Sequence, residues 1–206
     1  MWYKNERMRK AILHLKRADP VLAAIMDRVG SYRMNYDEPS FASLAEAIVY
    51  QQLHGKAAAT IFKRLTDLTG LPLEPEGILK LSDAEMRTAG LSKQKLSYLR
   101  DLATKTHSGE VRFSHLPGLS DDDVIKELTK VKGIGVWTAH MFLIFSLRRV
   151  NVLPTGDLGI QMAMRKHYRK RKLPKPAQME RIAKPWEPYR TVACWYLWRS
   201  LDIKTL

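Results

Sequence analysis

Apolar side chains recur along this chain with the spacing of α-helices. From Phe41 onward they fall at positions i, i+3, i+4, i+7 and i+8, which is one face of a helix, and Ser40 stands where an N-cap is expected. The same periodicity predicts helices at 3–17, 20–30, 41–50, 56–69, 76–81, 83–89, 93–107, 120–131, 136–147, from about 157, and 188–200. Strand alternation and internal repeats are not evident. The sequence therefore predicts a mainly α fold in two helical lobes.

Composition narrows the class of protein. The chain has 206 residues, of which 45% are hydrophobic, enough for a folded core. Its longest apolar run, 136–147, is shorter than the ~20 residues that span a bilayer. The charged start of the chain does not match a secretory signal peptide. Cys194 is the single cysteine, so an intramolecular disulfide and an all-cysteine cluster are excluded, and we expect a reducing intracellular compartment.

The charge balance favours a polyanionic partner. There are 35 Lys and Arg residues against 21 Asp and Glu, a formal net charge of +14. Nucleic acid is the first candidate and an anionic membrane the second, because basic side chains that neutralise phosphates release counterions. The densest basic segment is 165–172, followed by Lys175. Such a run is usually a solvated surface, and we expect it to contribute to nonspecific affinity.

A short turn with two glycines, Gly133-Ile134-Gly135, separates two predicted helices. Glycine permits positive φ and a close backbone approach, and the first amides of the second helix point outward with the positive end of the helix dipole. The turn can thus grip a DNA phosphate without reading bases. An ordinary connection between two helices is the alternative.

Asp157 is the candidate catalytic carboxylate. The twelve-residue helix after the turn rises about 18 Å and the loop beyond it spans up to ~30 Å, so the chain can return Asp157 toward the hairpin. The same residue precedes a predicted helix, where aspartate is a common N-cap. The two uses do not exclude each other.

Four segments resemble the helix-hairpin-helix DNA glycosylase superfamily, and within it the 3-methyladenine DNA glycosylase II type. They are residues 47–58, 128–139, 153–160 and 184–190. The resemblance implies a two-lobed helical glycosylase with its lesion pocket between the lobes. It also implies a monomer that binds double-stranded DNA containing a damaged base and requires no cofactor.

The resemblance carries an expected domain organisation. Residues 1–206 would form a single catalytic unit. One lobe would contain about 41–110, with a turn that probes the duplex. The other would contain about 118–160, completed by the N- and C-terminal helices, and the helix-hairpin-helix would cover about 122–147.

The family's catalytic aspartate falls at Asp157. A carboxylate there can stabilise an oxocarbenium-like sugar or take a proton from attacking water, and both roles remain open. An alkylated purine is already cationic and leaves readily. Bifunctional members have a Schiff-base lysine where this chain has Trp137, which implies a monofunctional enzyme that leaves an intact abasic site. The lack of further cysteines separates the chain from the iron–sulfur branch that resembles endonuclease III.

Aromatic residues are the candidates for a base pocket. An indole face attracts a cationic purine, so Trp137 and Trp186 are expected to stack against the extruded base, with Tyr189 as a further wall. Core packing is the alternative for all three, and it is the role expected for Trp195, Tyr196 and Trp198 in the last helix.

Polar residues at two turns are the candidates for DNA contact. The family inserts the turn at 51–55 into the duplex, so Gln52 would fill the gap left by the base and His54 would contact the minor groove. A solvated loop is the alternative for His54. The hairpin candidates are Lys132, Gly133, Ile134 and Gly135.

The family's hairpin often holds a monovalent cation, Na⁺ or K⁺, through backbone carbonyls. Here these would be the carbonyls of Thr129, Val131 and Gly133. Side chains with metal-ligand spacing are not evident, and Cys194, on an apolar helix, is expected to be inert core.

These observations lead to a monofunctional DNA glycosylase of base excision repair that removes alkylated purines. Two alternatives are a noncatalytic helix-hairpin-helix DNA-binding protein and a glycosylase for oxidised or mismatched bases. The expected location is the cytoplasm or nucleoid of a prokaryote, or a eukaryotic nucleus.

Overall fold

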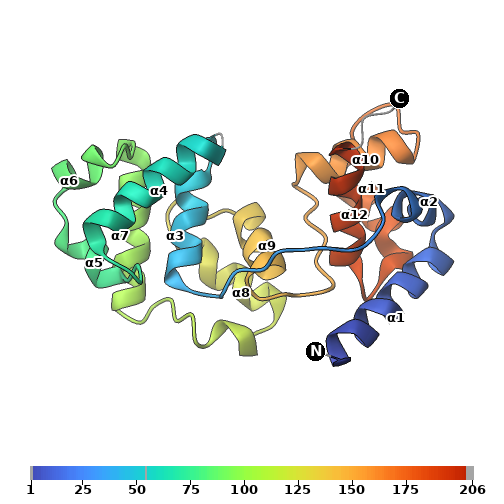
Figure 1. Cartoon of the computed structure of the whole chain (residues 1–206), viewed down its shortest axis with the longest axis horizontal. Helices are drawn as coiled ribbons and strands as arrows, with labels where there is room; N and C mark the ends of the chain where they lie inside the picture. The colour runs from blue at the N-terminus through green and yellow to red at the C-terminus, as the bar shows by residue number, and fades with distance from the viewer. Residues whose placement is uncertain (1, 54, 203–206) are drawn as a thin grey trace. The chain divides into compact units, whose positions relative to one another are not determined.

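The computed structural model describes residues 2–53 and 55–202, with side chains from residue 6 onward in these ranges. Over this part of the chain every regular element is a helix, which confirms the mainly α prediction (Figure 1). None of the described helices is long and apolar enough to cross a membrane. The elements are α1 (Trp2–Ala18), α2 (Pro20–Val29), α3 (Phe41–Tyr50), α4 (Gly55–Thr69), α5 (Pro75–Lys80), α6 (Asp83–Thr88), α7 (Lys93–His107), η1 (Leu116–Gly118), α8 (Asp121–Thr129), α9 (Val136–Phe145), α10 (Leu158–His167), α11 (Pro176–Ala183), η2 (Lys184–Trp186) and α12 (Arg190–Asp202).

The predicted helices match the observed α-helices apart from their ends and one omission, and the short 3₁₀ helices η1 and η2 were not predicted either. α11 was not predicted, because basic residues surround it and its apolar positions are few. Its signals are nevertheless present: Pro176 occupies the first turn, and Met179 and Ala183, four residues apart, are buried. Two buried side chains are therefore enough to pack this short helix against the core.

The chain forms two compact units, residues 36–147 and residues 1–35 with 148–206. This division corrects the expected one, in which the helix-hairpin-helix shared a lobe with the terminal helices. Hydrogen bonds explain the difference. The Lys132 N–H donates to Asp101 Oδ2 of α7 over 2.8 Å, and the Lys105 ammonium of α7 donates to the Lys130 carbonyl. The hairpin is thus fastened to α7, within the unit 36–147.

Unit 36–147 is built on α3. Its apolar stripe, Phe41, Leu44, Ala45, Ile48 and Val49, is at most 4% exposed. Helix α3 packs on α7, and α8 packs on α9 (Figure 1). Ser40 caps α3 in a reciprocal pair with Ser43, which fixes where the stripe begins. This packing gives the hairpin a rigid base.

The other unit is organised around the buried carboxylate of Asp19, the N-cap of α2. Its Oδ1 accepts from the Leu22 N–H over 3.0 Å. Its Oδ2 accepts from the Trp186 indole N–H over 2.9 Å and from the Tyr168 hydroxyl over 2.7 Å. Burial, and then Asp19, raises the pKa of Tyr168, so that hydroxyl keeps its proton. One carboxylate thereby joins α2, η2 and the end of α10.

Replacing Asp19 should destabilise the protein strongly. Asp19→Ala removes a helix cap and leaves two buried donors without an acceptor, so we expect the free energy of unfolding to fall by about 3 kcal/mol. Urea unfolding followed by circular dichroism measures the change. The matched control is Asp27→Ala, because Asp27 is exposed and pairs only with Lys16 at the surface, where the expected loss is below about 1 kcal/mol.

Candidate active site and nucleic-acid interface

The turn between α8 and α9 has the geometry of an anion-binding hairpin. Gly133 has a φ of +80°, in the left-handed region, and Gly135 is the N-cap of α9 with extended backbone. Ile134 is 5% exposed and anchors the turn to the protein core, while both glycines are exposed. The first amides of α9 therefore point away from the protein, with the positive end of the helix dipole behind them.

Gly133 is required for a second reason, its contact with Tyr98 of α7. A Cβ added at Gly133 would lie 2.1 Å from Tyr98 Cδ2 and 2.5 Å from Tyr98 Cγ. The Tyr98 ring lies flush against the turn and its hydroxyl accepts from Gln94 over 2.6 Å. Sequence reasoning identified the glycine but not the aromatic ring that excludes any side chain there.

The predicted probe turn adjoins this hairpin within the same unit. Gln51 follows α3, and its Nε2 donates to the Gly133 carbonyl over 3.0 Å. Gln52 is exposed and has a φ of +57°, an uncommon conformation for a residue other than glycine. His54 lies outside the described residues, so its predicted role stays a prediction. Gln51 fixes the turn and Gln52 projects from it.

An open pocket of about 520 Å³ lies beside the two turns. Trp137, in the first turn of α9, lines it and is 43% exposed. Tyr50 and Tyr98 line it as well. The one amine in its wall, Lys95, donates to the Val49 carbonyl over 2.5 Å, and burial lowers its pKa. The pocket thus offers aromatic walls beside a group of hydrogen-bonding side chains.

Asp157 is the helix cap that the sequence allowed, and its catalytic role stays a prediction. It is the N-cap of α10, with its Oδ1 accepting from the Ile160 N–H over 2.8 Å. The same oxygen accepts from the Trp198 indole N–H over 2.8 Å, and the residue is 8% exposed. Two donors therefore hold the Asp157 carboxyl group in one orientation, with little exposure to solvent.

Trp198 was expected to serve in packing, and its contact with Asp157 is the functional feature that sequence reasoning missed. The contact joins residues 41 positions apart, so no local pattern reports it. Gly159 makes room for it. A Cβ there would lie 3.1 Å from Asp157 Oδ1 and 3.1 Å from Trp198 Cδ1. The glycine two residues after the candidate catalytic aspartate is the sequence signal that could have predicted a close contact at this carboxylate.

Trp186 is not a base-pocket residue in this structure, which corrects the prediction. It is completely buried and donates to Asp19, so neither indole face is open to a base. Tyr189 is half-buried and makes an edge-to-face contact with His14 at a centroid distance of 5.5 Å. Its part in a pocket stays a prediction.

Cys194 lies in the same core, as expected for an inert thiol. It is 0% exposed, and burial, followed by the negative charge of Asp157, raises its pKa. The thiol therefore stays protonated and unreactive.

The hairpin carbonyls provide the donor set expected for a monovalent cation. Thr129 is the last residue of α8, where helix carbonyls point outward. The Val131 carbonyl accepts from the Ile134 N–H over 3.1 Å, and the Gly133 carbonyl accepts from Gln51. Each oxygen has two lone pairs, so these neutral oxygens fit a weakly charged, hard cation. Among the described residues, no group of three His, Cys, Asp or Glu side chains could hold a metal ion.

The chain belongs to the HhH-GPD superfamily of base excision DNA repair proteins, whose family model matches residues 45–188. It is similar to "DNA-3-methyladenine glycosylase 1" of Schizosaccharomyces pombe, with 37% identity over 93% of this chain and 86% of the relative. Two solved structures agree. The S. pombe 3-methyladenine DNA glycosylase Mag1, in complex with abasic DNA, has a TM-score of 0.83 and 36% identity over 94% of this chain and 97% of its own. A DNA-3-methyladenine glycosidase from Bacillus halodurans has a TM-score of 0.82 and 38% identity over 91% and 87%.

A methyl group at Gly133 should disrupt the hairpin. Gly133→Ala adds both left-handed backbone strain and the overlap with Tyr98, so we expect a loss of about 3 kcal/mol in the free energy of unfolding. Affinity for an undamaged duplex should fall as well, measured by fluorescence anisotropy under conditions where the variant is folded.

Gly109→Ala is the matched control for this change. Gly109 has a φ of +77° and belongs to the same unit, but a Cβ there meets nothing within 4 Å. The Gly109→Ala variant should lose about 1 kcal/mol in the free energy of unfolding, from backbone strain alone, and its duplex affinity should be unchanged. Equal losses for the two variants would contradict the role assigned to Tyr98.

Proposed function

We propose that this protein is a monofunctional DNA glycosylase of base excision repair, which flips alkylated purines of the 3-methyladenine type out of the duplex and hydrolyses the N-glycosidic bond. The observation that carries the proposal is the Asp157 carboxylate, fixed by the Ile160 and Trp198 N–H groups. The family and the relatives supply the reaction class to which this site belongs.

The reaction needs a negative charge near the sugar more than a strong acid. As the glycosidic bond breaks, the sugar gains oxocarbenium character, and the cationic purine leaves as a neutral base. Asp157 then either stabilises the sugar cation or accepts a proton from the attacking water. The two N–H donors keep the carboxylate aligned, so little reorganisation is needed during the reaction.

Trp137 supports hydrolysis without strand cleavage. A lyase forms a Schiff base through an amine, and an indole cannot do this. Its exposed face instead suits stacking on a cationic purine. We expect Tyr189 to contribute to binding the base, whereas Trp186 stabilises the core through its hydrogen bond to Asp19.

DNA binding would use the hairpin and the probe turn of one unit. The exposed amides at Gly133 and Gly135 would hold a phosphate, Lys132 would add its charge, and Gln52 would fill the gap left by the flipped base, with His54 at the minor groove. The carbonyls of Thr129, Val131 and Gly133 would hold a Na⁺ or K⁺ ion that strengthens the hairpin's attraction for phosphate. We expect the protein to act as a monomer.

The direct test is release of alkylated bases from duplex DNA by the pure protein. Wild type should release 3-methyladenine and leave strands that break only after alkali treatment. Asp157→Asn should lower the rate by at least about 100-fold, because it removes the charge opposite the sugar cation while keeping the cap. Duplex affinity should be retained, measured by anisotropy.

Asp67→Asn serves as the control, because Asp67 is exposed and paired only with Lys63. It should leave base release unchanged. DNA binding without any base release by the wild type would instead indicate a noncatalytic binding protein. Preferential release of oxidised or mismatched bases from a panel of lesion duplexes would contradict the stacking role of Trp137.

Trp198 is expected to position the carboxylate. Trp198→Phe keeps an aromatic ring but removes the N–H donor to Asp157, so we expect kcat to fall about tenfold with KM little changed, the loss expected for one hydrogen bond to a charged group. Trp195→Phe, in the same helix, controls for the loss of indole volume, since Trp195 is buried and Trp198 is half-buried. A fall in kcat that is equal in both variants would contradict the positioning role.

A further inference from the structure

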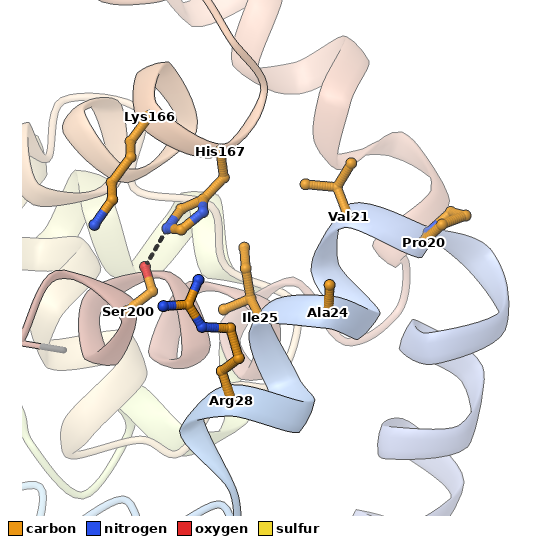
Figure 2. A pocket seen from close by; sticks show the side chains of 8 residues that line it. All are labelled: Pro20, Val21, Ala24, Ile25, Arg28, Lys166, His167 and Ser200. Atoms are coloured by element: carbon orange, nitrogen blue, oxygen red, sulfur yellow. Dashed lines mark hydrogen bonds between the residues drawn. The ribbon is translucent and has the colours of Figure 1, made fainter. Parts of the chain in front are cut away.

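A second pocket opens in the unit formed by residues 1–35 and 148–206, and the proposed reaction does not use it. Its volume is about 380 Å³, and its walls come from α2, the end of α10 and α12 (Figure 2). Lys166 and His167 line it, nine or ten residues beyond Asp157, which places the pocket about 14 Å along α10 from that carboxylate.

The pocket has an apolar end and a cationic end. Pro20, Val21, Ala24 and Ile25 of α2 form the apolar end, and Val21 is 38% exposed. Figure 2 shows the Arg28 guanidinium, the Lys166 ammonium and the His167–Ser200 pair gathered at the other end. This arrangement suits a ligand with a negatively charged group on an apolar body.

The His167–Ser200 pair is held by the fold. The Ser200 hydroxyl donates to the Leu197 carbonyl over 2.6 Å, so its oxygen accepts from His167 Nε2–H over 2.9 Å. Burial, and then the charges of Lys166 and Arg28, lowers the pKa of His167. The two cations therefore act on the ring from different helices, and the imidazole is neutral at pH 7.

The two cations of the pocket are Arg28 and Lys166. In the part of the chain that the structure describes, Arg28 and Lys166 form no ion pair. The acidic residues of the pocket's helices α2 and α12 are engaged elsewhere: Asp27 of α2 pairs with Lys16, and Asp202 of α12 pairs with Arg199 over 3.3 Å. An anion entering the pocket would thus meet two positive charges without displacing a carboxylate.

We propose that this pocket binds an organic phosphate, with the phosphate between Arg28 and Lys166 and an apolar body, about one ring in size, against Val21 and Ile25. The Arg28 fork can donate two parallel hydrogen bonds to phosphate oxygens, and Lys166 adds a point charge. The volume is at the lower end of the roughly 300–1,000 Å³ found for small-molecule sites, which matches one ring and one phosphate.

Phenyl phosphate is the probe, and NMR of the full-length protein is the measurement. Binding should shift the His167 ring signals and the methyl signals of Val21 and Ile25 together. Inorganic phosphate should bind at least about tenfold more weakly, because it lacks the apolar body, and benzylamine should not bind. Equal affinity for inorganic phosphate and phenyl phosphate, or shifts that miss these three residues, would overturn the proposal.

Charge variants locate the site. Arg28→Gln and Lys166→Gln should each weaken phenyl phosphate binding about tenfold, the loss expected for a charge-assisted hydrogen bond. Arg17→Gln is the matched control, since Arg17 is an exposed cation of the same unit that does not line this pocket. An equal loss in the control would indicate attraction to net charge and overturn the assignment. Each variant's unfolding curve checks that it is folded.

A competition experiment identifies the source of the phosphate. A lesion-free DNA duplex is added to protein saturated with phenyl phosphate. Loss of the phenyl phosphate shifts at Val21 and Ile25 would assign the phosphate to a nucleotide of DNA, with its sugar and base as the apolar body. Retention of the shifts while the duplex binds would assign it to a free small molecule.

Discussion

A buried aspartate that receives an indole N–H is the interaction on which the unit around Asp157 depends, and it occurs twice. Asp19 caps α2 and accepts from Trp186, and Asp157 caps α10 and accepts from Trp198. Each residue is 8% exposed. A carboxylate loses hydration when it is buried, and donors fixed by the fold replace that hydration. The same arrangement thus supports the core at one site and orients the proposed catalytic carboxylate at the other.

In unit 36–147 the geometry depends instead on a steric constraint. The Tyr98 ring fills the space where a side chain at residue 133 would begin, and Gln51 reaches the carbonyl of the same residue. The turn that would grip phosphate and the turn that would enter the duplex therefore share one backbone position. Flexibility in one of them would be transmitted to the other through a single hydrogen bond and a ring contact.

Local patterns predicted the helices well because each depends on residues within one or two turns of each other. The stripe starting at Phe41, the cap at Asp157 and the glycines of the hairpin all follow from near neighbours. The roles of the tryptophans did not. Trp186 donates to an aspartate 167 residues away, and Trp198 donates to one 41 residues away. Only folding brings those partners together. The placement of the hairpin with α7 was missed for the same reason, since Asp101 and Lys132 are distant in sequence.

The order of the chain has a consequence for synthesis. Residues 36–147 are contiguous, whereas the unit that carries Asp157 is assembled from residues 1–35 and 148–206. During synthesis, residues 36–147 are all available before residues 148–206, with which the first two helices pack. Trp198 is on α12, so the carboxylate acquires this donor only after residue 198 has been synthesised. A prematurely ended chain would therefore keep the hairpin and lack an organised carboxylate.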